Sequence, residues 1–482
     1  MPEKKLEAVR TRFAPSPTGF LHVGGLRTAL YSFLFAKKND GQFILRIEDT
    51  DQSRQVETAV ENLISTLNWA NLTYDEGPEK EGAFGPYIQS QRLPIYQKHA
   101  KQLIEQDHAY YCFCSAERLE QVRQRKIAAK LPPAYDRQCR NLDPKITAER
   151  IANGEKFVIR MKVPLEGEST FTDLIRGVVN INYKNIDDQV LLKSDGFPTY
   201  HLAVVIDDHY MQISHVIRGE EWLSSTPKHL LLYAYFTWQA PQFAHIPLLL
   251  NPDKSKLSKR QGDVAVEDYI KKGFTQEALV NFIALLGWNP GTTREIFSLE
   301  DLIQEFSLDR VGKSGAIFNI EKLSWINHKW LTSYDPEKLL PLVLPYIAKN
   351  YPQVAALDTE CLHNLIKLIQ KDLITLSDCT RLLAFYFEKP TNLNKDGLKD
   401  FTHLDQMVAI IKANLPIIDG TAFLPAVKAA AKAQQIPLSS LFPTIRYALT
   451  GNLEGFGIQE LINILGAIES SGRLKTFVDV AG

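Results

Sequence analysis

The chain has 482 residues, of which 45% are hydrophobic and 23% charged, and its net charge of −1 argues against a strongly basic nucleic-acid coat protein. This length exceeds what one hydrophobic core supports and predicts two to four domains. Because no apolar run reaches about 18 residues and the N-terminus lacks an apolar leader, we expect a cytoplasmic protein without a membrane span, whose five cysteines are reduced.

The first fifty residues alternate between strand and helix patterns. Residues 9–14 form a short extended run that ends at two prolines, and apolar residues recur at helical spacing from Leu26. A second strand is predicted at 43–47, and it runs into Glu48. Strand, loop, helix and strand open a parallel α/β sheet, in which ligands bind beyond the carboxyl ends of the strands.

Residues 108–190 interrupt this pattern and read as an insertion. Antiparallel strands are predicted at 157–163 and 177–183. The stretch 118–140 holds seven cations and two acidic residues. It is interpreted as a solvated helix face, with a local nucleic-acid track as the alternative.

The α/β pattern resumes after the insertion. Strands are predicted at 214–218 and 245–250, and the helix between them at 228–236 has Thr226 as its predicted N-cap. From about residue 265 onward the apolar periodicity is helical.

A loop rich in proline and glycine follows the first predicted strand. It begins at Arg12 and contains Ser16, His22 and Gly24, with three glycines within seven residues. Glycines let backbone N–H groups approach an anion, and the start of a helix adds a positive field. The pattern therefore predicts a phosphate site in which His22 donates, with a plain strand-to-helix turn as the alternative.

A second loop is cationic. Residues 254–260 contain Lys254, Lys256, Lys259 and Arg260, between a proline and a glycine. Lysines in such a loop can stabilise the negative charge that develops during phosphoryl transfer. The alternative is an exposed basic loop without a ligand, which is the more common structure for this pattern.

Together the two loops resemble the signature motifs of class I aminoacyl-tRNA synthetases, and further strings match the bacterial glutamyl-tRNA synthetases in order and spacing. The matching strings are RFAPSPTGFLHVGG, FILRIEDTD, GPYIQSQR, LLKSDGFPTYHLA, VIRGEEW, NPDKSKLSKR and RYALTGNLEGFGIQELINILG. One departure is Gly25, where the wider superfamily often has a second histidine, so that backbone N–H groups must replace its phosphate contact.

The resemblance implies an α/β class I dinucleotide-fold catalytic domain with an α+β insertion, followed by an all-α anticodon-binding half. The implied catalytic domain has two halves, 1–107 and 191–239, and the acceptor-stem insertion at 108–190 lies between them. A stem-contact region with the cationic loop follows at 240–330. The helical anticodon-binding region is 331–482.

The resemblance also implies a function. It is the activation of L-glutamate by ATP with Mg²⁺, followed by transfer to the 2′-hydroxyl of the terminal adenosine of tRNA(Glu), and in some enzymes of tRNA(Gln). The expected enzyme is a monomer without a membrane partner.

The implied site residues match chemical need, because glutamate offers two carboxylates and one ammonium. Glu48 is expected to take the ammonium, and Arg12, Tyr200 and Arg218 the side-chain carboxylate, with Ser16 also in the pocket. His22, Gly24, Lys256 and Lys259 are expected to bind ATP, and Arg446 the anticodon.

Three cysteines of the insertion resemble the zinc ligands of some family members. Cys112, Cys114 and Cys139 supply three thiols, but the position of a fourth ligand two residues after Cys139 is Asn141. The phenol of Tyr135 is a poor substitute because it is protonated near neutral pH. The sequence therefore favours free thiols over a structural zinc.

Two rival functions carry different signatures. A glutamyl-queuosine tRNA synthetase resembles only the catalytic half and lacks the helical half that follows residue 330. A catalytically inactive RNA-binding paralogue would not need Arg12, His22, Glu48, Lys256 and Lys259 together.

Overall fold

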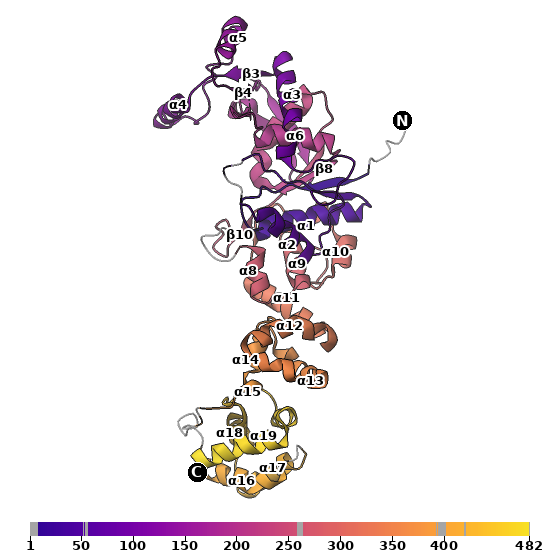
Figure 1. Ribbon diagram of the computed structural model, residues 1–482, viewed down its shortest axis with the longest axis vertical. Coiled ribbons are helices and arrows are strands. Elements are labelled where there is room, and N and C mark those ends of the chain that lie inside the picture. Colours follow the sequence, from indigo (N-terminus) through magenta and orange to yellow (C-terminus); the bar gives the residue numbers. More distant parts are fainter. Residues whose placement is uncertain are drawn as a thin grey trace. The chain divides into compact units, whose positions relative to one another are not determined.

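The computed structural model describes residues 8–51, 53, 56–257, 264–391, 393, 402–418 and 421–481. The chain divides into two compact units (Figure 1). The first comprises residues 1–271 and 276–323, and the second comprises 272–275 and 324–482. Every residue predicted to bind glutamate lies in the first unit.

Parallel strands form the centre of the first unit. β1 (Arg10–Phe13) pairs with β2 (Gln42–Leu45), and β8 (His215–Gly219) pairs with β9 (Gln242–Ile246), both in parallel. The Ser214 N–H donates to the Arg10 carbonyl at 3.0 Å, which places the start of β8 beside β1. The carboxyl ends of the strands therefore meet at one edge, as the strand–helix pattern predicts.

The strand predicted at 245–250 is split. β9 ends at Ile246, and a short β10 (Leu249–Leu250) pairs instead with β11 (Ala316–Ile317). Pro247, which cannot donate to a ladder, lies between the two strands and explains the break.

Helix α1 (Val23–Lys38) follows the first loop and begins within one turn of the helix that the periodicity predicts. His22 is its N-cap, and the His22 side chain accepts from the Gly24 N–H. Leu26, Leu30 and Leu34 are fully buried at spacings of one turn, so this face anchors the helix in the core.

Two further helices carry residues toward the strand ends. α6 (Tyr200–Tyr210) follows the insertion, and α7 (Thr226–Tyr235) lies between β8 and β9. The prediction that Thr226 caps α7 is wrong, because the N-cap is Ser225 after a 3₁₀ turn and Thr226 is the first helical residue. Its hydroxyl has another use, as a hydrogen-bond acceptor for Arg218 at 2.9 Å.

The insertion contains antiparallel strands, as predicted. β3 (Ala109–Cys112), β4 (Val158–Met161) and β7 (Val190–Leu192) form one sheet. β5 (Glu168–Asp173) and β6 (Gly177–Asn182) form a hairpin, and Asp173 joins β9 in parallel at Phe243. Helices α4 (Ala116–Ala128) and α5 (Pro144–Ala152) lie at the periphery of the first unit (Figure 1).

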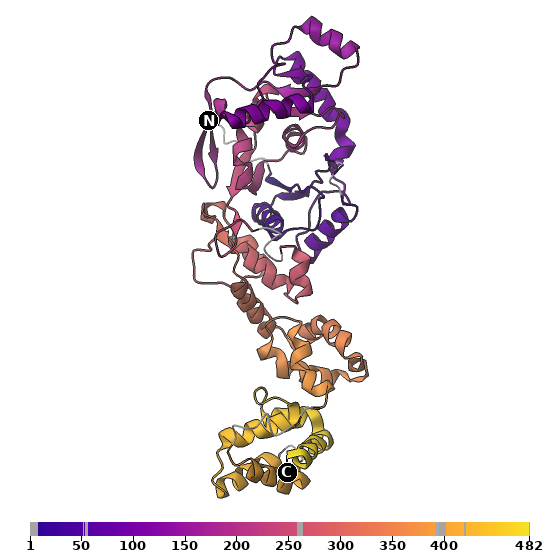
Figure 2. The same cartoon turned by 90° about the vertical axis from the view of Figure 1, so that its left-hand side faces the viewer.

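The other helices of the first unit are α2 (Ala59–Trp69), α3 (Leu93–Glu105), α8 (Val266–Lys271), α9 (Gln276–Ala284) and α10 (Leu299–Glu305). The secondary-structure elements described in the second unit are helices, as the periodicity predicts (Figure 2). Its elements are most of α11 (Ile320–Ser333), then α12 (Pro336–Asn350), α13 (Thr359–Ile369), α14 (Asp378–Leu382), α15 (Ala384–Phe387), α16 (Leu404–Asn414), α17 (Phe423–Ala433), α18 (Leu438–Thr450) and α19 (Ile458–Ala481), which is interrupted at Gly466. Among the helices described, none has the length and hydropathy of a membrane span.

Candidate active site

A cavity of about 740 Å³ lies at the carboxyl ends of β1, β2 and β8. All five residues predicted to bind glutamate line it, namely Arg12, Ser16, Glu48, Tyr200 and Arg218. They come from four separate segments of the chain. The sequence did not single out Thr50, Lys193 and Glu221, which line the same cavity.

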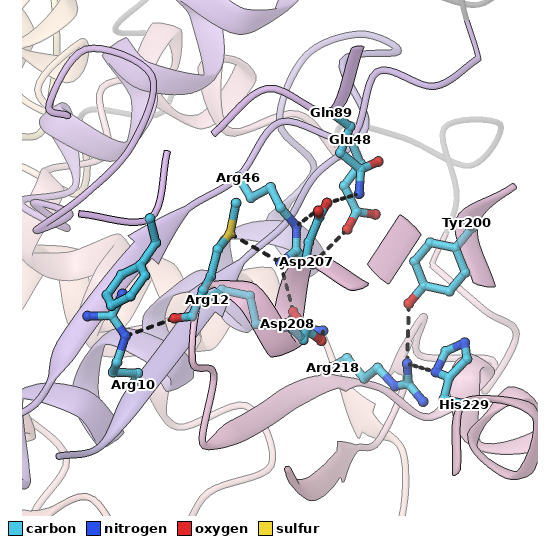
Figure 3. A network of polar contacts seen from close by, with 12 residues as sticks. Arg10, Arg12, Arg46, Glu48, Gln89, Tyr200, Asp207, Asp208, Arg218 and His229 are labelled. Carbon is cyan, nitrogen blue, oxygen red and sulfur yellow. Dashed lines mark hydrogen bonds and ion pairs between the residues drawn. The ribbon is translucent and has the colours of Figure 1, made fainter. Parts of the chain in front are cut away.

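A network of buried ion pairs includes Arg12 and Glu48, which line this cavity (Figure 3). Arg12 donates to both carboxylate oxygens of Asp208 at 3.1 and 3.3 Å, and Arg46 donates to the same carboxylate at 2.7 Å. Arg92 donates to Asp207 at 2.7 Å. Both aspartates are on α6, so this network fixes the helix that begins with Tyr200 against the strands.

Glu48 lies where β2 runs into the cavity, and only 7% of its surface is exposed. Arg46 donates to its carboxylate at 3.0 Å. Burial, partly offset by the charges of Arg46 and Arg12, raises the pKa of Glu48 to about 7. A carboxylate that titrates near neutrality can accept an ammonium group above this pH and loses that ability below it.

We expect this titration to appear in the kinetics of amino-acid activation. The ionised form of Glu48 attracts the substrate ammonium, so kcat/KM for glutamate should fall about tenfold for each pH unit below 7 and level off above it. Pyrophosphate exchange between pH 6 and 8.5 measures this profile, since kcat/KM reports the free enzyme. A Glu48→Gln variant should have a low kcat/KM for glutamate, and this kcat/KM should not change with pH. A flat profile for the wild type would contradict the assignment.

Arg218 enters the cavity from β8. Its Nη1 donates to the Tyr200 hydroxyl at 3.2 Å, and the Tyr200 ring lies 4.2 Å from the ring of Trp222. Its remaining donors point to His229, His245 and Thr226. Neither histidine is predicted from the sequence, although a polar residue near the end of a parallel strand, as His245 is, could be a signal.

A second cavity of about 390 Å³ lies beside the start of α1. His22, Gly24 and Lys256 line it, so three of the four residues predicted to bind ATP come together. The fourth, Lys259, lies outside the residues that the structure describes. Because His22 Nδ1 accepts from the Gly24 N–H at 2.9 Å, the proton of a neutral imidazole at this position is on Nε2.

The three cysteines of the insertion also come together. The sulfur atoms of Cys112, Cys114 and Cys139 lie within 4.8 Å of one another, and those of Cys114 and Cys139 are 3.6 Å apart. A tetrahedral zinc with bonds of about 2.3 Å separates two sulfurs by about 3.8 Å, so this spacing fits a metal site. The Tyr135 hydroxyl lies 3.3 Å from Cys112 and 3.4 Å from Cys114, where a fourth ligand would be.

The pKa values of two of the thiols shift in opposite directions. The hydrogen bond from Cys139 lowers the pKa of Cys112 to about 4, and the same interaction raises the pKa of Cys139. Arg118 donates to Cys114 at 3.4 Å, and the Arg160 guanidinium lies 4.0 Å from the centre of the Tyr135 ring. These cations partly offset the charge that three thiolates would bring.

The basic stretch of the insertion is largely ion-paired. Arg118 pairs with Asp136, Arg123 with Glu120, and Arg137 and Arg140 both pair with the buried Asp188. In α4 only Val122 is buried, which agrees with the interpretation of a solvated helix face.

In the second unit, Arg446 lies on α18. Its Nε donates to the Phe456 carbonyl at 2.8 Å, and its Nη1 donates to the Leu453 carbonyl at 2.6 Å. Arg446 thus holds the loop between α18 and α19. Cys361 of α13 is half-buried and Cys379 of α14 is buried.

Comparison with known families matches both parts of the chain. The catalytic-domain model of the class I tRNA synthetases (E and Q) matches residues 8–325, and an anticodon-binding-domain model matches residues 338–478. The glutamate–tRNA ligase of Alkaliphilus metalliredigens is 44% identical over 98% of this chain and 99% of its own length. That of Chlorobium chlorochromatii is 52% identical over 82% and 81%.

Solved structures agree with these matches. The crystal structure of a glutamate tRNA ligase from Elizabethkingia meningosepticum, in complex with its amino acid, has a TM-score of 0.92 at 35% identity and covers 99% of this chain and 100% of that one. The glutamate–tRNA synthetase of Elizabethkingia anophelis has a TM-score of 0.90 at 35% identity, over 98% and 100%.

Proposed function

The chain belongs to the class I tRNA synthetases for glutamate and glutamine, among the glutamate–tRNA ligases, and on this premise we propose how it acts. It activates L-glutamate with Mg²⁺·ATP and esterifies the 2′-hydroxyl of the terminal adenosine of tRNA(Glu). The observation that carries this proposal is the cavity in which Arg12, Glu48, Tyr200 and Arg218 converge.

The reaction has two steps. A carboxylate oxygen of glutamate attacks the α-phosphorus of ATP, which forms glutamyl-adenylate and releases pyrophosphate. The 2′-hydroxyl of tRNA then attacks the glutamyl carbonyl, loses its proton and displaces AMP. Neither step needs a protein nucleophile, because alignment and charge stabilisation carry the catalysis.

Each end of glutamate has its partners in the cavity. The carboxylate of Glu48 receives the ammonium, and Arg12, Arg218 and Tyr200 hold the side-chain carboxylate, with Ser16 at the pocket wall. The fully buried Arg46 supports Glu48, so that the ammonium meets a positioned acceptor. Burial of these charges strengthens the preference for glutamate over amino acids that lack one of its charged groups. Such a substrate would leave a buried polar group of the protein without its partner, which is costly.

The second cavity suits the triphosphate. His22 donates from Nε2, the Gly24 position lets the backbone approach, and Lys256 and Lys259 supply positive charge to the departing pyrophosphate. We also propose that the protein acts as a monomer.

Recognition of tRNA uses both units in this proposal. The insertion at 108–190 contacts the acceptor stem, the region 240–330 contacts the stem, and the helical region 331–482 binds the anticodon. Arg446 is assigned to the anticodon because it organises the loop between α18 and α19.

Pyrophosphate exchange and charging assays test the function. With tRNA(Glu) present, the protein should exchange pyrophosphate in a glutamate-dependent manner, whereas an inactive RNA-binding paralogue would bind tRNA without exchange. Charging of purified tRNA(Glu) and tRNA(Gln) then decides whether the second tRNA is also a substrate. Loss of charging on removal of the helical unit would separate this enzyme from a glutamyl-queuosine synthetase.

The thiol cluster is the second part of the proposal. The sequence favours free thiols, but the spacing of Cys112, Cys114 and Cys139 supports a structural zinc. The Tyr135 oxygen would be a neutral and weaker fourth ligand, because burial raises the pKa of its phenol. The metal would join the end of β3 to the segment around Cys139 and stabilise the insertion without a part in the chemistry.

Elemental analysis of chelator-free protein should find about one zinc per chain. Cys139→Ser should lose most of this zinc, because the remaining ligands no longer close a tetrahedron. Cys361→Ser, which changes a thiol in the second unit, is the matched control and should keep it. A wild-type content well below one zinc per chain would restore the interpretation as free thiols.

A further inference from the structure

The hydrogen-bond partners of Arg218 are all neutral. The side chain is 5% exposed. Nε donates to His245 Nε2 at 3.0 Å, Nη1 to His229 Nδ1 at 3.1 Å and to Tyr200, and Nη2 to Thr226 Oγ1 at 2.9 Å. The fifth contact is from Nη2 to the Trp222 carbonyl at 3.4 Å. Within the described part of the chain, no carboxylate is a hydrogen-bond partner of this guanidinium.

The other arginines around the cavity are different. Arg12 and Arg46 share Asp208, Arg46 also binds Glu48, and Arg92 binds Asp207. Each of these three guanidiniums thus has at least one directly bonded carboxylate. Arg218 is the buried arginine beside this network whose charge no directly bonded carboxylate compensates.

The protons of the histidines follow from these contacts. Arginine can only donate, so His245 Nε2 and His229 Nδ1 must both accept. His245 therefore carries its proton on Nδ1 and donates to Asp173 at 2.6 Å. His229 carries its proton on Nε2 and donates to His201 Nδ1 at 3.0 Å. Each hydrogen bond in this series fixes the tautomer of the next imidazole ring.

Asp173 anchors one end of this series of hydrogen bonds. It is 1% exposed, and its Oδ1 accepts from the N–H groups of Ile175 at 3.0 Å and Arg176 at 2.8 Å. Its charge therefore orients His245 while the imidazole ring keeps the carboxylate apart from Arg218. Burial also keeps the pKa of His229 well below its usual value and lowers that of His201 to about 3, so the rings stay uncharged.

We propose that His229 and His245, oriented by His201 and Asp173, are positioning residues that fix Arg218 without neutralising it, and that this selects a carboxylate over the amide of glutamine. The inference rests on the proposed function. A directly bonded carboxylate would fix Arg218 equally well, but it would cancel the charge that the substrate must meet. Neutral acceptors fix the geometry and leave the charge available.

The cavity side of Arg218 agrees with this role. Tyr200 and Trp222 line the cavity, whereas His229, His245 and Thr226 are not among its lining residues. The contacts to Tyr200 and Trp222 are also the two longest, at 3.2 and 3.4 Å. A substrate carboxylate would replace these two contacts and bind both terminal nitrogens, while the neutral acceptors keep theirs.

The test places a carboxylate beside Arg218. His229→Asp should raise the KM for glutamate by about tenfold to a hundredfold in pyrophosphate exchange with tRNA present, while kcat and the KM for ATP change little. The preference for glutamate over glutamine should fall with it. His229→Asn, which offers a neutral acceptor, should rescue most of the affinity and the preference. His209→Asp, a like change at a histidine stacked on Trp238, is the matched control.

A second pair of variants covers the case in which His229→Asp does not fold. Thr226 is the first residue of α7, where an aspartate suits the helix N-terminus, so Thr226→Asp should fold and Thr226→Asn is its neutral match. Equal KM values for the Asp and Asn variants, or an unchanged preference for glutamate, would overturn the inference. If the wild type activates no glutamate, the proposed function fails instead.

Discussion

Replacing Arg218 by alanine should raise the KM for glutamate by roughly two to three orders of magnitude, because a substrate carboxylate loses its charge partner in a buried site at a cost of roughly 2–5 kcal/mol. Arg218 as a whole is 5% exposed, so water cannot replace its guanidinium efficiently. Pyrophosphate exchange over a range of glutamate concentrations measures the effect, and the KM for ATP should stay near that of the wild type.

Arg218→Lys is the informative control for this prediction. Lysine restores the charge but not the two parallel donors, nor the contacts with His229 and His245, so the KM should recover only in part. Arg218 would not be a glutamate ligand if the alanine variant changed the KM by less than about threefold.

The site residues that lie within short sequence motifs could be predicted from the sequence. Arg12 and His22 belong to one loop of prolines and glycines, and Glu48 ends an apolar strand, so local patterns and family strings place them together. The strands and helices of the first fifty residues lie within a few positions of those expected, because buried apolar runs determine them.

Pairings between distant segments could not be predicted in this way. Asp208 lies 196 residues after Arg12. No periodicity in the sequence shows that the Arg12 guanidinium binds both oxygens of the Asp208 carboxylate. The same holds for His229, which a local pattern presents as an ordinary residue of a helix, whereas His245 is signalled only by its place near the end of a parallel strand. Thr226 shows how such a pairing overrides local preference, since its hydroxyl binds Arg218 instead of capping α7.

The charge of the basic stretch in the insertion also depends on distant pairings. The sequence shows seven cations there, but Asp188, which lies 48 residues after Arg140, accepts from both Arg137 and Arg140. Composition counts charges along the chain, whereas the field at the surface depends on which of them are paired.

Replacing Lys256 by alanine should lower the turnover of pyrophosphate exchange and of aminoacylation together, by on the order of a hundredfold. Lys256 lines the second cavity beside His22, where negative charge moves onto the departing pyrophosphate. A charge contact made mainly in the transition state affects kcat and kcat/KM alike, so saturating ATP should not restore the rate. Steady-state exchange and single-turnover transfer from preformed adenylate measure the two steps separately.

Two further variants show whether this effect belongs to the chemical step. Lys313→Ala removes an exposed lysine whose ammonium contacts only the Arg176 carbonyl among the interactions described, and it should behave as the wild type. Arg446→Ala should raise the KM for tRNA and leave turnover at saturating tRNA nearly unchanged, because it alters the loop between α18 and α19 and not the second cavity. If Lys256→Ala spared exchange while it blocked transfer, the lysine would act on tRNA, and the assignment of the second cavity to the triphosphate would fail.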